Sequence, residues 1–205
     1  MKIGVIDYGA SNIFSVARAL NSLGAKTKIV KDSDDLKKID KLVFPGQGSM
    51  GSCINRLNEA ELFEPMKNFV ENKPFLGICL GLQVLFENSE ESFNQKGLGI
   101  FSGKIEKFKS NDETKLKIPH MGWNQVEFSQ DHFLWNGLKS KENFYFVHSY
   151  ISTKLENSNI FSQTVHGQKF NSAIGNENIF ATQFHPEKSG ELGLRFLQNF
   201  INWRP

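Results

Sequence analysis

The sequence predicts a three-layer α/β domain whose central sheet is mostly parallel and carries an antiparallel extension. In the first half, short apolar runs alternate with helical segments, the pattern of a parallel sheet covered by helices. In the second half, strand-length segments follow one another through polar loops with no long helix between them. No repeat or low-complexity linker interrupts the 205 residues, so we expect one domain over residues 1–205.

The first half is expected to alternate between strands and helices. Residues 2–8 form a continuous apolar run, as in a parallel strand covered on both faces. The turn over 7–12 can cap a helix over 13–23, after which Gly24 stands where a left-handed residue ends a helix. Four further elements and one ambiguous segment follow: strands over 26–30 and 41–44, a helix over 52–71, a strand over 75–79 and a helix-compatible run over 82–87.

The second half is expected to consist mainly of strands and to end in one helix. That helix covers about residues 190–203, and its apolar residues recur on one face. The expected strands cover residues 103–108, 124–128, 144–151, 162–166 and 179–184.

Composition and charge exclude several classes of partner. The net charge of +2 is dispersed, whereas a binder of nucleic acid or anionic membranes would concentrate its basic residues. The longest apolar stretch, residues 74–86, is too short to span a bilayer. Residues 1–7 predict a strand rather than a signal peptide, and the two cysteines have neither zinc nor disulfide spacing. We therefore expect a reduced, cytoplasmic protein with no metal, no nucleic acid and no membrane.

Residues 77–81, Gly-Ile-Cys-Leu-Gly, have the pattern of a nucleophile elbow with cysteine in place of serine. A predicted strand enters this segment and a helix-compatible run leaves it, and the sharp turn between them has no room for bulky neighbours. Cys79 would then face a helix N-terminus, which favours the thiolate. The N–H of Leu80 would be placed to bind an oxyanion. The alternative is that Cys79 is a small buried side chain at a Gly-rich strand end.

His185 and Glu187 follow the predicted strand over 179–184 and could act as a base and its orienting carboxylate. In an extended chain, residues two apart point the same way, and Pro186 stiffens the step between these two. Glu187 would hold one imidazole nitrogen and leave the other to face Cys79, as in a catalytic triad. His-Pro-Glu alone is a weak signal, but together with the cysteine elbow it indicates a catalytic site. Cys53 lies in a helical segment without such an elbow, and we expect it to be inert.

Together, residues 77–83 (Gly-Ile-Cys-Leu-Gly-Leu-Gln) and 184–187 (Phe-His-Pro-Glu) resemble the class I, or triad, glutamine amidotransferases. Within that class the chain resembles the glutaminase subunits, called HisH, of imidazole glycerol phosphate synthase. The stretches that carry this narrower resemblance are Asp-Tyr-Gly-x-x-Asn over 7–12, Pro-His-Met-Gly-Trp-Asn over 119–124, Tyr-Phe-Val-His-Ser-Tyr over 145–150 and His-Pro-Glu-Lys-Ser over 185–189. The resemblance covers nearly the whole chain and implies a flavodoxin-like fold without a cofactor.

The resemblance also implies a reaction and assigns roles to matching residues. Cys79 would attack the side-chain amide of glutamine, His185 would shuttle protons and Glu187 would orient His185. The ammonia would pass to a (β/α)₈-barrel cyclase partner, HisF, in a heterodimer, and meet a phosphoribulosyl-formimino imidazole intermediate of histidine synthesis. The remaining roles are substrate binding by Gln83, His148, Ser149 and Tyr150, an oxyanion hole from Gln47, Gly48 and Leu80, and a partner interface from Asn12, Trp123, Tyr145 and Lys188.

One loop departs from the usual pattern of this family. The family commonly has Pro-Gly-Val-Gly, and residues 45–48 here are Pro-Gly-Gln-Gly. In the family this loop supplies an oxyanion-binding N–H after a peptide rearrangement. Gln47 offers the same backbone donor as valine, so we expect the reaction to be retained. Because glutamine is not β-branched and restricts its backbone less, we expect the rearrangement to be coupled differently to the partner.

Other interpretations compete with this one. Residues 46–51 match the Gly-x-Gly-x-x-Gly pattern of a dinucleotide site, but the next strand ends at Cys79 rather than at an acidic residue. No Walker loop is present, which argues against an ATP-dependent synthetase. A cysteine peptidase would not need segments 119–124 and 145–150, and a silent homologue would not keep all three triad residues. A paralogue that supplies ammonia to a surface-sugar amidotransferase would share the same glutaminase half, so the sequence leaves that alternative open.

Overall fold

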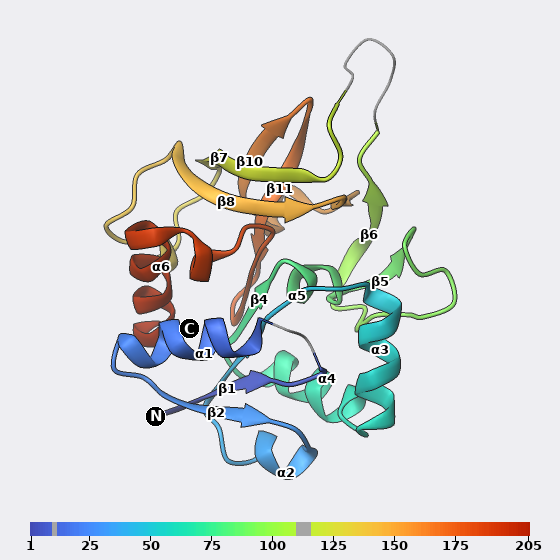
Figure 1. Ribbon diagram of the computed structural model, residues 1–205, viewed down its shortest axis with the longest axis vertical. Coiled ribbons are helices and arrows are strands. Elements are labelled where there is room, and N and C mark those ends of the chain that lie inside the picture. The colour runs from blue at the N-terminus through green and yellow to red at the C-terminus, as the bar shows by residue number, and fades with distance from the viewer. Residues whose placement is uncertain (10–11, 110–115) are drawn as a thin grey trace.

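The computed structural model describes residues 1–9, 12–109 and 116–205 (Figure 1). Within these ranges the main sheet has nine strands in the order β2-β1-β3-β4-β12-β11-β10-β7-β8, and a second sheet has the order β5-β6-β9. Part of the turn predicted at residues 7–12 lies outside the described residues, because 10 and 11 are not among them.

The parallel half of the main sheet brings together strands that lie far apart in the sequence. Its strands are β2 (Lys26–Val30), β1 (Lys2–Ile6), β3 (Lys41–Phe44), β4 (Phe75–Ile78) and β12 (Ile179–Thr182). The last of these comes from the far end of the sequence and pairs with the strand that leads into the cysteine elbow. As a result, the segments that follow β4 and β12 emerge at the same edge of the sheet.

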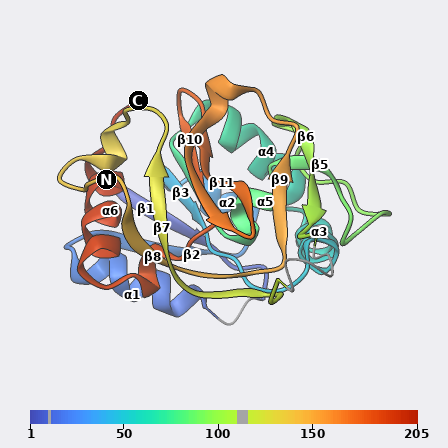
Figure 2. The same ribbon diagram turned by 90° about the horizontal axis from the view of Figure 1, so that it is seen from above.

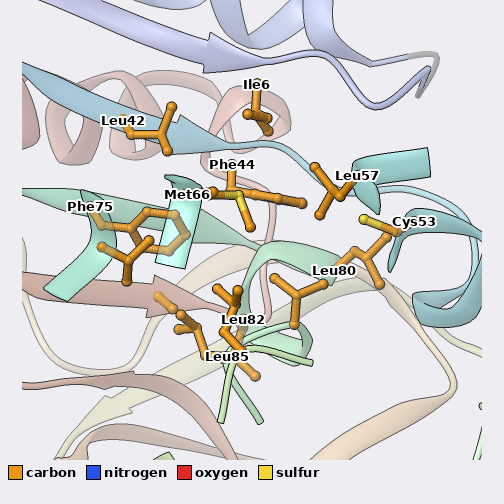
Figure 3. Packing of buried hydrophobic residues seen from close by; sticks show 14 of the residues in the cluster. Ile6, Leu42, Phe44, Cys53, Leu57, Met66, Phe75, Leu80, Leu82 and Leu85 are labelled. Atoms are coloured by element: carbon orange, nitrogen blue, oxygen red, sulfur yellow. The ribbon is translucent and has the colours of Figure 1, made fainter. Parts of the chain in front are cut away.

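Helices cover both faces of this parallel half (Figure 1). On one face, α1 (Ile13–Ser22) and α6 (Gly190–Asn202) contact each other and share a core with the strands. On the other face, α3 (Met50–Glu59) and α4 (Phe63–Asn72) enclose a second core, where Phe44 lies near helix and strand side chains (Figure 3). Successive strand residues belong to opposite cores, as the alternation of a strand requires.

The antiparallel extension continues the sheet beyond β12. Its strands are β11 (Gln168–Gly175), β10 (Ile160–His166), β7 (His120–Phe128) and β8 (Glu142–His148). In Figure 1 they stand above the helix-covered half. The register of β7 and β8 places His120 opposite His148 and Trp123 opposite Tyr145.

The second sheet lies beside this extension, as the view from above shows (Figure 2). It consists of β5 (Phe86–Ser89), β6 (Phe101–Lys107) and β9 (Tyr150–Thr153), with β6 and β9 antiparallel. A short helix, α2 (Ser33–Leu36), connects β2 to β3. None of the helices formed by the described residues has the length and apolar character needed to cross a membrane.

The predicted fold class is confirmed, but the single helix predicted over 52–71 is wrong. The structure has two helices, α3 and α4, and between them Glu61 takes a φ of 53°. Pro65 explains the break, because proline has no N–H to donate inside a helix and is tolerated in a first turn. The second helix begins at Phe63, two residues before Pro65, so the proline lies in that first turn.

Three predictions in the middle of the chain are also corrected. The helix-compatible run over 82–87 is a one-turn helix, α5 (Leu80–Gln83), followed by β5. The strand predicted over 144–151 is β8 and β9, which belong to different sheets and are separated by a bend at Ser149. No strand is predicted over 168–175, a segment that contains Asn and Gly, which are depleted in strands. Pairing with β10 and β12 forms β11 there.

A buried lysine fixes the C-terminal helix to the sheet. Lys41 is 2% exposed, and its Nζ donates to the backbone oxygens of Phe200 at 2.8 Å, Ile201 at 2.9 Å and Trp203. A cation near a helix C-terminus is stabilised by the unpaired carbonyl groups there. Burial lowers the pKa of Lys41 to about 8.

Candidate active site

Cys79 occupies the strained turn that the sequence predicts. Its φ of 52° and ψ of −97° lie outside the regions that L-residues normally occupy, and it stands between β4 and α5. A Cβ on Gly77 would lie 2.4 Å from the Gly81 carbonyl oxygen, and a Cβ on Gly81 would lie 2.3 Å from the Phe44 carbonyl oxygen. Both glycines are therefore sterically required, and the predicted elbow is confirmed.

His185 and Glu187 form a buried pair next to this turn. His185 Nδ1 lies 2.8 Å from Glu187 Oε1, and both side chains are fully buried. The pair is not made by a continuous strand, as the sequence implied, but by a 3₁₀ turn, Pro186–Lys188, that follows His185. Nε2 of His185 has no hydrogen-bond partner among the described residues, which leaves it available to a nucleophile.

Electrostatic interactions hold a proton on His185. Burial alone would favour the neutral ring, but the charge and hydrogen-bonding capacity of Cys79 and then of Glu187 outweigh it. Together they raise the pKa of His185 to about 10. Cys79 is the largest of the causes that raise the pKa of His185, so the structure places the cysteine close enough to the histidine to act on its protonation.

A cavity of about 340 Å³ opens at Cys79. This volume is at the small end of the range of about 300–1,000 Å³ that is usual for small-molecule sites. All four residues predicted to bind the substrate line it, and so do the three predicted to form the oxyanion hole: Gln83, His148, Ser149 and Tyr150, with Gln47, Gly48 and Leu80.

The loop that follows β3 is held by Tyr8. The phenol oxygen of Tyr8 accepts a hydrogen bond from the backbone N–H of Gln47 at 3.1 Å. It also lies 3.1 Å from the Pro45 carbonyl oxygen and 3.2 Å from that of Gln47. In this conformation the Gln47 N–H is directed to Tyr8 rather than to the cavity. Gly48 has a φ of +106°, and glycine reaches both positive and negative φ at low cost, so the backbone there can change conformation more easily than at other residues.

The residues predicted to face a partner divide into an exposed group and a buried one. The rings of Trp123 and Tyr145 lie 6.1 Å apart, and Lys188 Nζ lies 5.9 Å from the Tyr145 ring. Trp123 is 57% exposed, so this aromatic surface is available for contact. Asn12 is only 4% exposed, and its Nδ2 donates to Glu187 Oε1 at 3.2 Å, which places it against the predicted triad.

Two residues at the site, Gln183 and Glu91, were not singled out in the sequence, and Ser189 entered only as the last residue of the His-Pro-Glu-Lys-Ser stretch. Gln183 is fully buried, and its Nε2 lies 3.5 Å from Cys79 Sγ. Ser189 Oγ donates to the His185 carbonyl oxygen at 2.7 Å and accepts from the Tyr145 N–H at 3.0 Å, which fixes the turn. Glu91 lines the cavity and would offer a carboxylate to a substrate ammonium group. The sequence feature that could have pointed to Gln183 as a site residue is its position directly before the Phe-His-Pro-Glu segment.

The fold matches solved structures over nearly their whole length. A glutamine amidotransferase crystal structure is 19% identical, with a TM-score of 0.75, and the match covers 97% of this chain and 98% of that one. The PurLQS structure from Thermotoga maritima is 20% identical, with a TM-score of 0.77, covering 98% and 97%. At these identities the likeness establishes the fold.

Sequence comparisons identify the family. The family model for glutamine amidotransferase class-I matches residues 4–203. The imidazole glycerol phosphate synthase subunit HisH of Methanocaldococcus jannaschii is 46% identical over 200 residues, covering 97% of this chain and 98% of the relative. HisH of Chromobacterium violaceum is 44% identical over 209 residues, covering 99% and 98%. This chain therefore belongs to the class I glutamine amidotransferases and, within them, to the HisH subunits of imidazole glycerol phosphate synthase.

Proposed function

We propose that this chain acts as a single domain that hydrolyses glutamine through Cys79, His185 and Glu187 and delivers the ammonia to a HisF cyclase partner for histidine synthesis. The observation that carries the proposal is the buried His185–Glu187 pair beside a strained cysteine at the wall of a small cavity. The raised pKa of His185 supports it, because a protonated imidazole beside a thiolate is the resting state of a cysteine nucleophile.

The reaction divides into two steps at Cys79. The thiolate attacks the side-chain carbonyl carbon of glutamine, and His185 gives its proton to the leaving nitrogen, so ammonia departs and a glutamyl thioester remains. Water then attacks the thioester while His185 takes its proton, which releases glutamate and restores the thiolate. Glu187 keeps the ring oriented and stabilises its charge. We assign Gln83 and Glu91 to the polar end of the substrate, because both line the cavity and Glu91 is acidic.

The state of the oxyanion loop supports a dependence on the partner. The Gln47 N–H is bonded to Tyr8, so a developing oxyanion would have to rely on other donors, such as the Leu80 N–H. The loss of one oxyanion donor costs about 10²–10³ in turnover. We propose that the isolated chain is therefore a poor glutaminase, and that HisF activates it when the loop rearranges around Gly48.

The exposed surface of Trp123, Tyr145 and Lys188 is the proposed contact with HisF. It combines aromatic rings with a cation, a composition that is enriched in protein interfaces. We place the reaction in the cytoplasm, because the mechanism needs a reduced thiol, and Cys79 and Cys53 are both unpaired.

A labelling experiment tests the assignment of the nucleophile. A glutamine-analogue electrophile should add one label per chain at Cys79, while Cys79→Ala should lose both labelling and glutaminase turnover. Cys53→Ala is the matched control and should keep both, because Cys53 is buried in the core and burial raises the pKa of its thiol. Labelling mainly at Cys53, or turnover retained by Cys79→Ala, would overturn the assignment.

A binding and transfer experiment tests the partner. Mixing the chain with the barrel cyclase and its nucleotide ligand should give a heterodimer by size-exclusion chromatography, a large rise in glutaminase turnover and cyclase activity with glutamine as the nitrogen source. A cyclase that works only with added ammonium salts, or forms no complex, would refute this part of the proposal. That result would not contradict the proposed hydrolysis of glutamine by this chain.

A further inference from the structure

A chain of hydrogen bonds runs from the antiparallel extension to the wall of the cavity. Asn124 Nδ2 lies 3.1 Å from His120 Nε2, His120 Nδ1 lies 3.0 Å from His148 Nε2, and His148 Nδ1 lies 2.9 Å from the Tyr150 carbonyl oxygen. Both histidines are buried, at 4% and 5% exposed. They lie opposite each other in the register of β7 and β8.

The chemistry of the two ends fixes the direction of every bond in this chain. A carbonyl oxygen only accepts, so His148 carries its proton on Nδ1 and its Nε2 must accept from His120. His120 therefore carries its proton on Nδ1, and its Nε2 accepts from the amide group of Asn124. Asn124 has a defined orientation, because its Oδ1 accepts from the Gln125 N–H at 2.8 Å and its Nδ2 also donates to the Val165 carbonyl oxygen at 2.9 Å. The amide therefore presents a donor to His120.

Both rings are neutral in this arrangement. Burial lowers the pKa of His120 to about 4, and the neighbouring His166 acts in the same direction. Burial likewise lowers the pKa of His148 to about 3, and His120, His166 and His185 add to the effect. Ring packing contributes to the burial, since the ring of His120 stacks on Phe146 at 4.7 Å and on His166 at 4.1 Å.

The last bond in the chain closes the bend that shapes the cavity. His148 ends β8, Tyr150 begins β9 in the other sheet, and Ser149 forms the bend between them. All three residues line the cavity. Both ring nitrogens of His148 already have protein partners, so its ring contributes to the cavity as a wall and support rather than through a free nitrogen. Among the described residues, the side chain that satisfies Nε2 of His148 is His120, which does not itself line the cavity.

We propose that His120 is a positioning residue for glutamine binding: its Nδ1–H holds His148 in one tautomer and thereby fixes the bend at Ser149 that forms the cavity wall. The inference rests on the proposed function in so far as the cavity binds glutamine. Loss of the donor would leave a buried acceptor on His148 unsatisfied and let the 148–150 bend relax. The effect should fall on substrate binding rather than on the bond-breaking steps, because Cys79 and His185 are held by other contacts.

The experiment compares two amide substitutions of His120 in the complex with the barrel cyclase. An asparagine amide nitrogen reaches the position of Nδ1, whereas a glutamine amide nitrogen reaches that of Nε2, so the variants differ in reach and not in chemistry. His120→Asn should keep the KM for glutamine within about twofold. His120→Gln should raise it about tenfold, the effect expected for one unsatisfied buried acceptor, with kcat within about twofold. His166→Leu is the control, since it loses the ring stacked on His120 but no member of the hydrogen-bond chain, and its KM should not change.

A second measurement does not depend on any catalytic activity. In ¹⁵N NMR spectra of the imidazole rings, His120 and His148 of the wild-type protein should both be neutral with the proton on Nδ1, and His148 should lose this single tautomer in His120→Gln. Equal KM values for the two amide variants, or a His148 proton on Nε2, would overturn the inference. A complex without any glutaminase turnover would instead refute the proposed function and leave the tautomer result to decide this inference alone.

Discussion

Asn12 Nδ2 lies 3.2 Å from Glu187 Oε1, the same oxygen that contacts His185 Nδ1 at 2.8 Å. A residue from the first loop of the chain thus touches the carboxylate that orients the proposed base. Oε2 of Glu187 has no hydrogen-bond partner among the described residues, so the orientation of the carboxylate depends on these two contacts to Oε1. The segment expected to face the partner is in this way connected to the catalytic groups.

The three residues should differ in their effect on glutaminase turnover of the complex. His185→Asn should cost about 10²–10⁴ in kcat, because it removes the proton carrier. Glu187→Gln should cost less, since it keeps the shape and removes the charge. Asn12→Ala should cost least, because it removes one hydrogen bond to the carboxylate and leaves the carboxylate itself in place. Steady-state kcat values for the three variants decide the order. Equal losses for His185→Asn and Glu187→Gln would show that the assigned roles are wrong.

Tyr8→Phe should raise the basal glutaminase turnover of the isolated chain about fivefold to tenfold. The change removes the phenol oxygen that accepts from the Gln47 N–H, a bond worth on the order of 1 kcal/mol, and so releases the loop. Turnover of the complex should stay the same, and the activation by the partner should shrink by the same factor. Thermal unfolding of the variant controls for damage to the core around Phe44, on which Tyr8 stacks. An unchanged or lower basal turnover would argue that Tyr8 does not restrain the loop.

The protonation of His185 should depend on Cys79. The folded protein holds this proton with a pKa of about 10, above the value of about 6.5 for an unfolded chain. The stabilisation from this proton is therefore complete below pH 6.5 and is lost as pH rises through about 10. NMR titration of the ring should give a high pKa in the wild-type protein and a lower one in Cys79→Ala, which lacks the thiolate. A pKa that is equal in the two proteins would mean that Cys79 and His185 do not form an ion pair.

Lys41→Ala should lower the free energy of unfolding by about 3 kcal/mol. The substitution leaves the last carbonyl groups of α6 without their buried donor and opens a cavity under the helix. Urea unfolding at pH 7 measures the difference. Lys38→Ala is the matched control, because that lysine is exposed, and its effect should stay within about 0.5 kcal/mol. A loss for Lys41→Ala no larger than for the control would show that Lys41 does not anchor α6.

The sequence by itself determined the features that depend on local geometry. The glycines around Cys79 indicated a sharp turn, because each is needed where a Cβ would strike backbone atoms. The apolar runs indicated a helix-covered sheet, since strand and helix periods differ. These patterns arise from residues a few positions apart, and the order of the motifs along the chain pointed to the family.

Only the tertiary structure decided how distant segments meet. The pairing of β12 with β4 carries His185 to Cys79, and packing decides that Asn12 turns inward to Glu187 and that the Gln47 N–H turns to Tyr8. The pairing of β11 with β10 and β12 likewise follows from what that segment contacts. Hydrogen bonds and packing contacts between residues far apart in the chain leave no periodic pattern in the sequence. These contacts determine which polar groups are paired and which remain free to react.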